Sequence, residues 1–217
     1  MNGIAKYLII SICTITMFVM LTISICFVDV QAIGPQGSSV GFASLNNYVH
    51  NLTGVHLGLY NITDWLGFVP IFICIGFSIL GLIQWIRRRS IRNVDCSILI
   101  LGMFYIITIL LFGFFEIFVV NYRPVLINGS LEASYPSSTT LLATCVMPTA
   151  LMQFNNRIKS KMLRNFLSVI IIVFVAFMLI GRLVSGVHWF TDIVGGALIS
   201  TGLVMMYRAF INKFQEL

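Results

Sequence analysis

Six separate runs of apolar residues, each about as long as a membrane-spanning helix, constrain this chain more than any other feature. An α-helix rises 1.5 Å per residue, so about 20 apolar residues are needed to cross the hydrocarbon core of a bilayer. The runs cover about 7–28, 66–86, 97–120, 137–154, 166–183 and 192–210. They predict an all-α fold, an integral membrane bundle of about six transmembrane helices.

The composition agrees with lipid as the main solvent. Of the 217 residues, 59% are hydrophobic and only 9% are charged, whereas a soluble domain carries about 25% charged residues. The net charge of +6 could indicate a nucleic-acid partner, but the basic residues lie between the hydrophobic runs. That placement is typical of the positive-inside rule. We therefore expect a bilayer and no nucleic acid as the surroundings of this chain.

The basic residues also predict an orientation. Eleven of the thirteen fall on one side of a six-helix alternation: Lys6, Arg87, Arg88, Arg89, Arg92, Arg157, Lys159, Lys161, Arg164, Arg208 and Lys213. That side is predicted to be cytoplasmic. We therefore expect a multi-pass protein of the plasma membrane with both termini inside. Arg123 and Arg182 are predicted to lie on the outer side, where topology disfavours arginine, so a local requirement is expected for both.

The segment 29–65 is the longest outer segment and contains no lysine or arginine. Its interleaved apolar residues favour either a helix on the membrane surface or an ordered loop that caps the bundle. His50 and His56 lie in it, and the sequence places nothing nearby that would orient them. The five cysteines lack metal-ligand spacing and are expected to be free thiols, with no disulfide framework and no metal site.

Unusual polar residues concentrate in three outer segments, 116–124, 135–140 and 181–192. In the third, His188 and Asp192 are four residues apart and can touch on a helical turn. A carboxylate bound to one imidazole nitrogen fixes the tautomer and leaves the other nitrogen free as a nucleophile or base. The alternative is a histidine that only satisfies a helix terminus.

The two outer arginines favour a catalytic role for this histidine. Two guanidinium groups, Arg123 and Arg182, can bind the non-bridging oxygens of a phosphoryl group. Hydroxyl and backbone N–H groups at the start of the fourth helix would add an anion site. Together with His188 and Asp192, these groups predict phosphoryl transfer. No cofactor and no metal are expected, because the arginines can compensate the charge of the phosphate.

These residues resemble the motifs of the type 2 phosphatidic acid phosphatase superfamily of lipid phosphatases, whose fold vanadium haloperoxidases share. The family pattern is K-x6-R-P, then P-S-G-H, then S-R-x5-H-x3-D. Here the chain reads Glu116-x6-Arg123-Pro124, then Pro136-Ser137-Ser138-Thr139, then Gly181-Arg182-x5-His188-x3-Asp192. The resemblance covers the chain from about 66 to the end. With no internal repeat, the helices are expected to form one membrane domain over 1–217, with the first helix and outer loop in 1–65 and a phosphatase-like core in 66–217.

The resemblance also implies roles for single residues. His188 would be the nucleophile that forms a phosphohistidine, and Asp192 would orient it. The substrate phosphate would be held by five residues: Arg123, Arg182, Ser137, Ser138 and Thr139.

Four positions depart from the family pattern. Thr139 replaces the histidine that protonates the leaving oxygen, a role worth about 10²–10⁴-fold in rate. Glu116 replaces the lysine of the first motif, Gly181 a serine, and Ser138 a glycine. We hypothesise that Glu116 is the substitute acid, on the assumption that it shares a helix face with Arg123.

Two functions follow from these departures. In the first, the protein hydrolyses a lipid-linked phosphate or diphosphate of the polyprenyl or diacylglycerol type. A diphosphate is preferred, because a departing lipid monophosphate depends less on an acid. In the alternative, a catalytically impaired member binds lipid phosphates as a sensor, carrier or scaffold. A transporter or channel is disfavoured, because the middle of the membrane is nearly free of charge.

Overall fold

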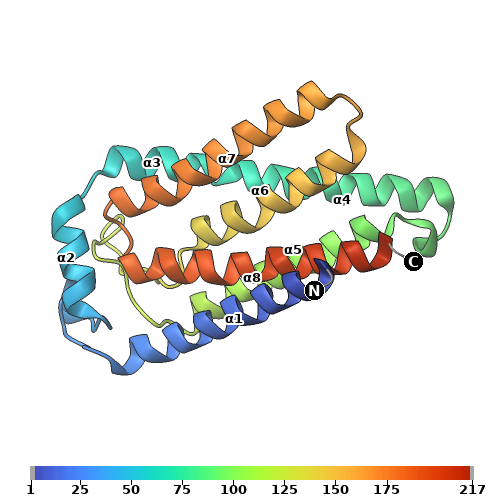
Figure 1. Cartoon of the computed structure of the whole chain (residues 1–217). Helices are drawn as coiled ribbons and strands as arrows, with labels where there is room; N and C mark the ends of the chain where they lie inside the picture. Colours follow the sequence, from blue (N-terminus) through green and yellow to red (C-terminus); the bar gives the residue numbers. More distant parts are fainter. Residues whose placement is uncertain (1–2, 216–217) are drawn as a thin grey trace.

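The computed structural model describes residues 3–215 and is a bundle of long helices (Figure 1). The described chain forms eight α-helices, α1 (Gly3–Phe27), α2 (Ala43–Thr53), α3 (Leu57–Leu66), α4 (Phe68–Arg88), α5 (Cys96–Ile117), α6 (Ser138–Arg157), α7 (Lys161–Val184) and α8 (Phe190–Gln215). Two single 3-10 turns, η1 (Pro35–Gly37) and η2 (Ile91–Asn93), lie in the loops. Residues 3–215 contain isolated β-bridges but no strand. The predicted all-α class is confirmed.

Five helical segments are long and apolar enough to cross a membrane: Gly3–Phe27, Leu57–Arg88 (α3 and α4 taken together), Cys96–Ile117, Lys161–Val184 and Phe190–Phe214. The sixth predicted span corresponds to α6, which has 20 residues but is less apolar. α6 lies between α7 and α8 (Figure 1) and also contacts α4 and α5. Because neighbouring helices cover most of its surface, α6 needs fewer apolar side chains than a helix that faces lipid. The predicted membrane bundle is thus confirmed.

Large apolar side chains project outward from the other long helices. A soluble protein rarely exposes so much contiguous apolar surface, and lipid is the solvent that stabilises it. Examples are Ile12 and Met20 on α1, Phe72 and Ile79 on α4, Met103 and Leu110 on α5, and Val169 and Ile172 on α7.

The outer segment is largely helical and caps one end of the bundle. α2 lies across the end of α8 (Figure 1), and Asn46 of α2 exchanges two hydrogen bonds with Thr191, at 3.0 and 3.1 Å. The ring of His50 lies 5.5 Å from that of Trp189. α3 leads into α4 with only Gly67 between them. Of the two alternatives for segment 29–65, the cap describes it better than a helix lying only on the membrane surface.

At the opposite end of the bundle, one carboxylate links three helices. Asp95 accepts hydrogen bonds from Arg88, Arg157 and Gln84, each at 2.9 Å, and so connects α4, α5 and α6. Partial burial raises the pKa of Asp95, but these hydrogen bonds outweigh it and leave the pKa below its usual value. The start of α1 and the end of α8 lie toward this end (Figure 1).

The third predicted helix, 97–120, extends beyond the helix that the structure shows. α5 ends at Ile117, so Arg123 lies in the following loop, and the assumption that Glu116 and Arg123 share a helix face is wrong. Pro124 disfavours helical backbone at Arg123. The loop instead doubles back, with the Arg123 N–H donating to the Glu132 carbonyl at 3.1 Å and the Ser134 N–H donating to the Asn121 carbonyl at 2.9 Å.

Gly186 connects the α7–α8 turn to the cap. Its φ of +68° favours glycine, and a Cβ at this position would lie 1.9 Å from the carbonyl oxygen of Gly54. We predict that Gly186→Ala destabilises the protein by about 1–3 kcal/mol, because both the backbone strain and the clash must be relieved. Thermal unfolding in detergent measures this. Gly76→Ala is the control, because nothing lies within 4 Å of its Cβ position and it should not lower the melting temperature.

Candidate active site

The three predicted motif segments meet at the capped end of the bundle. The loop 118–137 follows α5, the second motif begins α6, and the third motif spans the end of α7 and the start of α8. Their polar side chains are buried there: Arg123, Ser137, Thr139, Arg182, His188 and Asp192 are each at most 9% exposed. Buried polar and charged groups are costly unless they are paired, so their accumulation in one place indicates a functional site.

His188 and Asp192 lie together, as predicted. His188 Nδ1 is 3.7 Å from Asp192 Oδ2, which is too long for a direct hydrogen bond. Ser134 bridges the two: its hydroxyl lies 3.0 Å from His188 Nδ1 and donates to Asp192 Oδ2. The backbone N–H of Trp189 also donates to Asp192 Oδ2, at 2.8 Å. The Nδ1 side of the imidazole is therefore occupied, which fixes the orientation of the ring.

The other imidazole nitrogen is free. His188 Nε2 is buried and has no hydrogen-bond partner within residues 3–215. Burial lowers the pKa of His188 well below its usual value, and the positive charges of Arg123 and Arg182 lower it further. The ring is therefore neutral near pH 7, and Nε2 keeps the lone pair that a nucleophile or base requires.

Arg182 is almost completely buried and is held by three side chains. It donates to Thr139 Oγ1 at 2.6 Å, Thr63 Oγ1 at 3.3 Å and Asp64 Oδ1 at 3.3 Å. Thr139, at the position of the family histidine, thus accepts a hydrogen bond from the guanidinium group. Thr63 and Asp64 belong to α3, which lies outside all three motif segments.

Arg123 is held by the loop that carries it. Its Nε lies 3.2 Å from Glu132 Oε2, although the N–H is not aligned for a hydrogen bond, and Nε and NH1 have no hydrogen-bond partner in the described chain. Glu132 is 40% exposed, which weakens the attraction through solvent screening. Arg123 therefore keeps buried donors for an anion.

Tyr60 of α3 lies beside both guanidinium groups. The centre of its ring is 5.0 Å from Arg182 Cζ and 5.9 Å from Arg123 Cζ, within the range of cation–π attraction. One aromatic ring thus holds two like charges near each other.

Five residues of this site were not predicted from the sequence, namely Ser134, Glu132, Tyr60, Thr63 and Asp64. Ser134 and Glu132 lie between the first and second motifs. Tyr60, Thr63 and Asp64 lie in the outer segment, more than 50 residues before Arg123. No pattern along the chain marked them, because their contacts form only when the cap folds over the bundle.

The start of α6 faces the same region. Ser137 is its N-cap residue, and its hydroxyl accepts from the Thr140 N–H at 3.5 Å, while its own N–H donates to the Asp192 carbonyl at 3.1 Å. This last bond joins the second and third motifs. The first turn of α6 is therefore positioned to supply N–H donors to an anion.

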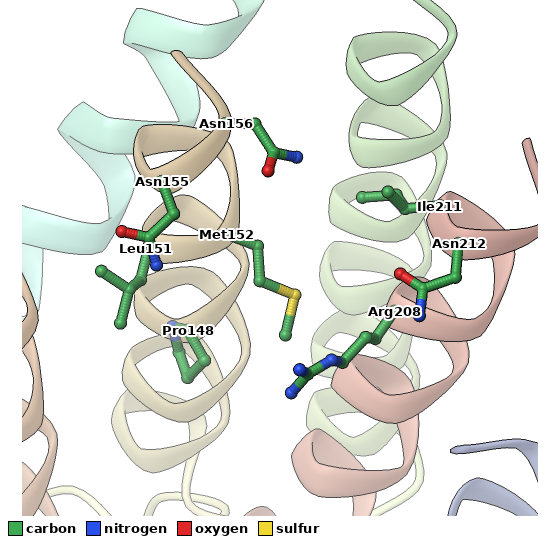
Figure 2. Close-up of a pocket in the computed structure, with 8 residues that line it drawn as sticks. All are labelled: Pro148, Leu151, Met152, Asn155, Asn156, Arg208, Ile211 and Asn212. Carbon is green, nitrogen blue, oxygen red and sulfur yellow. The ribbon is translucent and has the colours of Figure 1, made fainter. Parts of the chain in front are cut away.

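Glu116, at the end of α5, lines a small pocket together with Ser134, Ser138 and His188. The structure therefore brings Glu116 near His188, although Glu116 does not share a helix face with Arg123. A larger cavity lies toward the other end of the bundle, between α6 and α8 (Figure 2), away from these residues. Within residues 3–215, no group of three or more His, Cys, Asp or Glu side chains is arranged to hold a metal ion, and the five cysteines are free.

The family to which these motifs point also matches the sequence directly. Residues 116–216 match the PAP2 superfamily. The resemblance drawn from the three motifs is confirmed. All eight predicted site residues lie within this match, which we call the PAP2 segment. Thr63, Asp64 and Tyr60 lie outside it.

A solved structure shares the fold over nearly the whole chain. It is the crystal structure of the first transmembrane PAP2 type phosphatidylglycerolphosphate phosphatase from Bacillus subtilis. The similarity covers 95% of this chain and 96% of that chain, with a TM-score of 0.64 and 19% identity. The likeness therefore includes α1 and the cap as well as the PAP2 segment. No curated protein matches the sequence.

The environment of His188 predicts an unusual titration. Because the pKa of His188 is lowered well below the usual 6.5, this side chain stays unprotonated in the folded protein between pH 8 and pH 6.5. The unfolded chain takes up that proton, so this residue makes the protein less stable as the pH falls below about 6.5. Histidine-selective NMR in detergent should show a resonance, absent from His188→Ala, that does not titrate between pH 8 and 6. A midpoint near 6.5 would contradict a buried imidazole beside two guanidinium groups.

Proposed function

We propose that this protein is a membrane lipid phosphatase that hydrolyses a lipid-linked phosphate or diphosphate through a phosphohistidine at His188. One observation carries the proposal: the buried, unpartnered Nε2 of His188 lies on a ring whose Nδ1 is held by Ser134 beside Asp192. The match of residues 116–216 to a superfamily of phosphatases supports the same reaction class.

The proposed reaction has two steps. In the first, the lone pair of His188 Nε2 attacks phosphorus, and the bond between phosphorus and the leaving oxygen breaks. In the second, water attacks the phosphohistidine, the P–N bond breaks, and inorganic phosphate departs with Nε2 restored. Arg123, Arg182 and the first turn of α6, with Ser137, Ser138 and Thr139, stabilise the charge on the phosphoryl oxygens. Asp192 stabilises the positive charge that develops on the imidazole.

The leaving oxygen also needs a proton or a stable negative charge. Thr139 is a poor acid and is already bonded to Arg182. Glu116 lines the same pocket as His188, so we propose it as the acid that replaces the family histidine. A lipid diphosphate reduces this requirement, because a departing phosphate monoester carries negative charge better than an alkoxide. Diphosphates of the polyprenyl or diacylglycerol type are therefore the preferred substrate class.

The topology proposed for this activity follows the positive-inside rule. The site would open on the outer face of the plasma membrane, with both termini in the cytoplasm. The whole chain, 1–217, would act as one domain, because Arg182 of the PAP2 segment is held by Thr63 and Asp64 of the cap.

Binding of lipid phosphates without turnover is the second candidate function. The hydrogen bond from Arg182 to Thr139 favours this function. Thr139 occupies the position of the family histidine that acts as the acid, so no acid stands at that position. In that case Arg123 and Arg182 would still capture the phosphate, and the protein would act as a sensor, carrier or scaffold.

Phosphate release by purified protein in detergent distinguishes these functions. With phosphatidic acid, an isoprenyl monophosphate and an isoprenyl diphosphate as substrates, we predict release that is fastest for the diphosphate. His188→Ala should abolish it, because the nucleophile is lost. Absence of release from all three substrates, together with lipid-phosphate binding that disappears in Arg123→Gln, would instead support the binding function.

Glu116→Gln tests the proposed acid. We predict a loss of about 10²-fold or more in kcat on the monophosphate and a smaller loss on the diphosphate, because the better leaving group depends less on protonation. Glu132→Gln is the matched control: it removes a carboxylate that lies outside the pocket lined by Glu116 and beside Arg123, so any change in turnover should be the same for the monophosphate and the diphosphate. Near-normal monophosphate turnover by Glu116→Gln would eliminate Glu116 as the acid and leave the role of His188 unaffected.

A further inference from the structure

A second candidate binding site lies between α6 and α8, toward the end of the bundle where α1 begins and α8 ends. It is a cavity of about 340 Å³ (Figure 2). The residues that line it are Pro148, Leu151, Met152, Asn155 and Asn156 of α6, and Arg208, Ile211 and Asn212 of α8. None of them belongs to the candidate active site, so a ligand here is independent of the proposed function.

The polar groups of this cavity are suited to an anion. In Figure 2 the guanidinium group of Arg208 extends from α8 toward α6, and the amide of Asn156 points toward α8. Arg208 has no acidic partner within 4.0 Å in the described part of the chain, whereas Arg88 and Arg157 at the same end share Asp95. Tyr7 of α1 supports Arg208 from the side, with its ring centre 4.5 Å from Arg208 Cζ. An unpaired guanidinium beside amide donors favours a phosphate group.

An apolar groove adjoins this cavity. It has a volume of about 320 Å³ and is lined by Pro148 and Leu151 of α6 and Ile171, Ile172, Val175, Ala176 and Leu179 of α7. Pro148 and Leu151 line both the cavity and the groove. The positively charged cavity thus lies next to an apolar groove, at Pro148 and Leu151, and this groove runs along a helix that faces lipid.

This pairing of compartments matches one class of ligand. A phospholipid carries its phosphate at the level of the helix ends and its acyl chains along the apolar surface. Basic pockets between transmembrane helices bind anionic headgroups in this way. A soluble phosphate ester would use the cavity and leave the groove empty.

We propose that the α6–α8 cavity and the α6–α7 groove together bind one phospholipid with an anionic headgroup, at the end of the bundle opposite the candidate active site. Arg208 binds the phosphate, the amides of Asn156 and Asn212 bind the headgroup, and one acyl chain lies against Leu151.

Native mass spectrometry of the full chain, released from nanodiscs that contain phosphatidylglycerol and phosphatidylcholine, tests this proposal. We expect the wild-type protein to retain one phosphatidylglycerol in preference to phosphatidylcholine. Arg208→Gln should weaken phosphatidylglycerol retention about tenfold, because a charge-assisted hydrogen bond is lost. Leu151→Trp should weaken it as well, because the indole ring fills the groove.

Two control variants and one soluble ligand show whether retention depends on this cavity. Arg87→Gln removes a positive charge from the end of α4, outside the cavity, and should retain the lipid. Arg123→Gln alters the candidate active site and should also retain it. Equal retention by Arg208→Gln and the wild type would overturn the proposal, as would a loss that occurs in Arg123→Gln instead. Binding of glycerol phosphate as tight as that of phosphatidylglycerol would overturn the assignment to a lipid.

Discussion

The arrangement of the candidate active site depends on one buried carboxylate, Asp192. Burying a carboxylate is costly unless hydrogen bonds compensate it, and Oδ2 of Asp192 accepts two of them, from separate segments. Ser134, in the loop after α5, donates to its carboxylate, and the Trp189 N–H of the α7–α8 turn does the same. The backbone carbonyl of Asp192 accepts from the Ser137 N–H at the start of α6. The contacts of Asp192 therefore join the loop after α5, the start of α6 and the α7–α8 turn, and Ser134 holds the imidazole of His188 beside them.

The two arginines give the site its positive charge, and the carboxylates beside them determine how strongly that charge can attract a phosphate. Arg182 is neutralised in part by Asp64, and Arg123 by Glu132. Both carboxylates are substantially exposed, so an arriving phosphate can replace them at modest cost. Tyr60 holds the two guanidinium groups near each other. The cap thus takes part in the site through Tyr60, Thr63 and Asp64, although these residues precede the PAP2 segment.

The features that could be predicted from the sequence are those that are local along the chain. Hydrophobic runs predicted the long helices, because a span in lipid is set by length and apolarity. The spacing of Arg182, His188 and Asp192 predicted their proximity, because all three lie at one turn between two helices. The prediction that Glu116 and Arg123 share a helix face was wrong, because α5 ends at Ile117, before the chain reaches Arg123 and Pro124. Ser134, Tyr60 and Asp64 carried no signal, since their contacts arise from tertiary packing across many residues. The low apolarity of α6 follows from its central position, which composition alone does not reveal.

The central claim is that Nε2 of His188 attacks phosphorus, and trapping the covalent intermediate tests it most directly. The purified protein would be mixed with an isoprenyl diphosphate, quenched in alkali, where phosphohistidine survives, and its peptides mapped by mass. We predict a phosphoryl group on the peptide that contains His188, at His188 itself, which disappears as turnover ends. Steady release of phosphate with no phosphoryl group on His188, or with one on another residue, would contradict the claim.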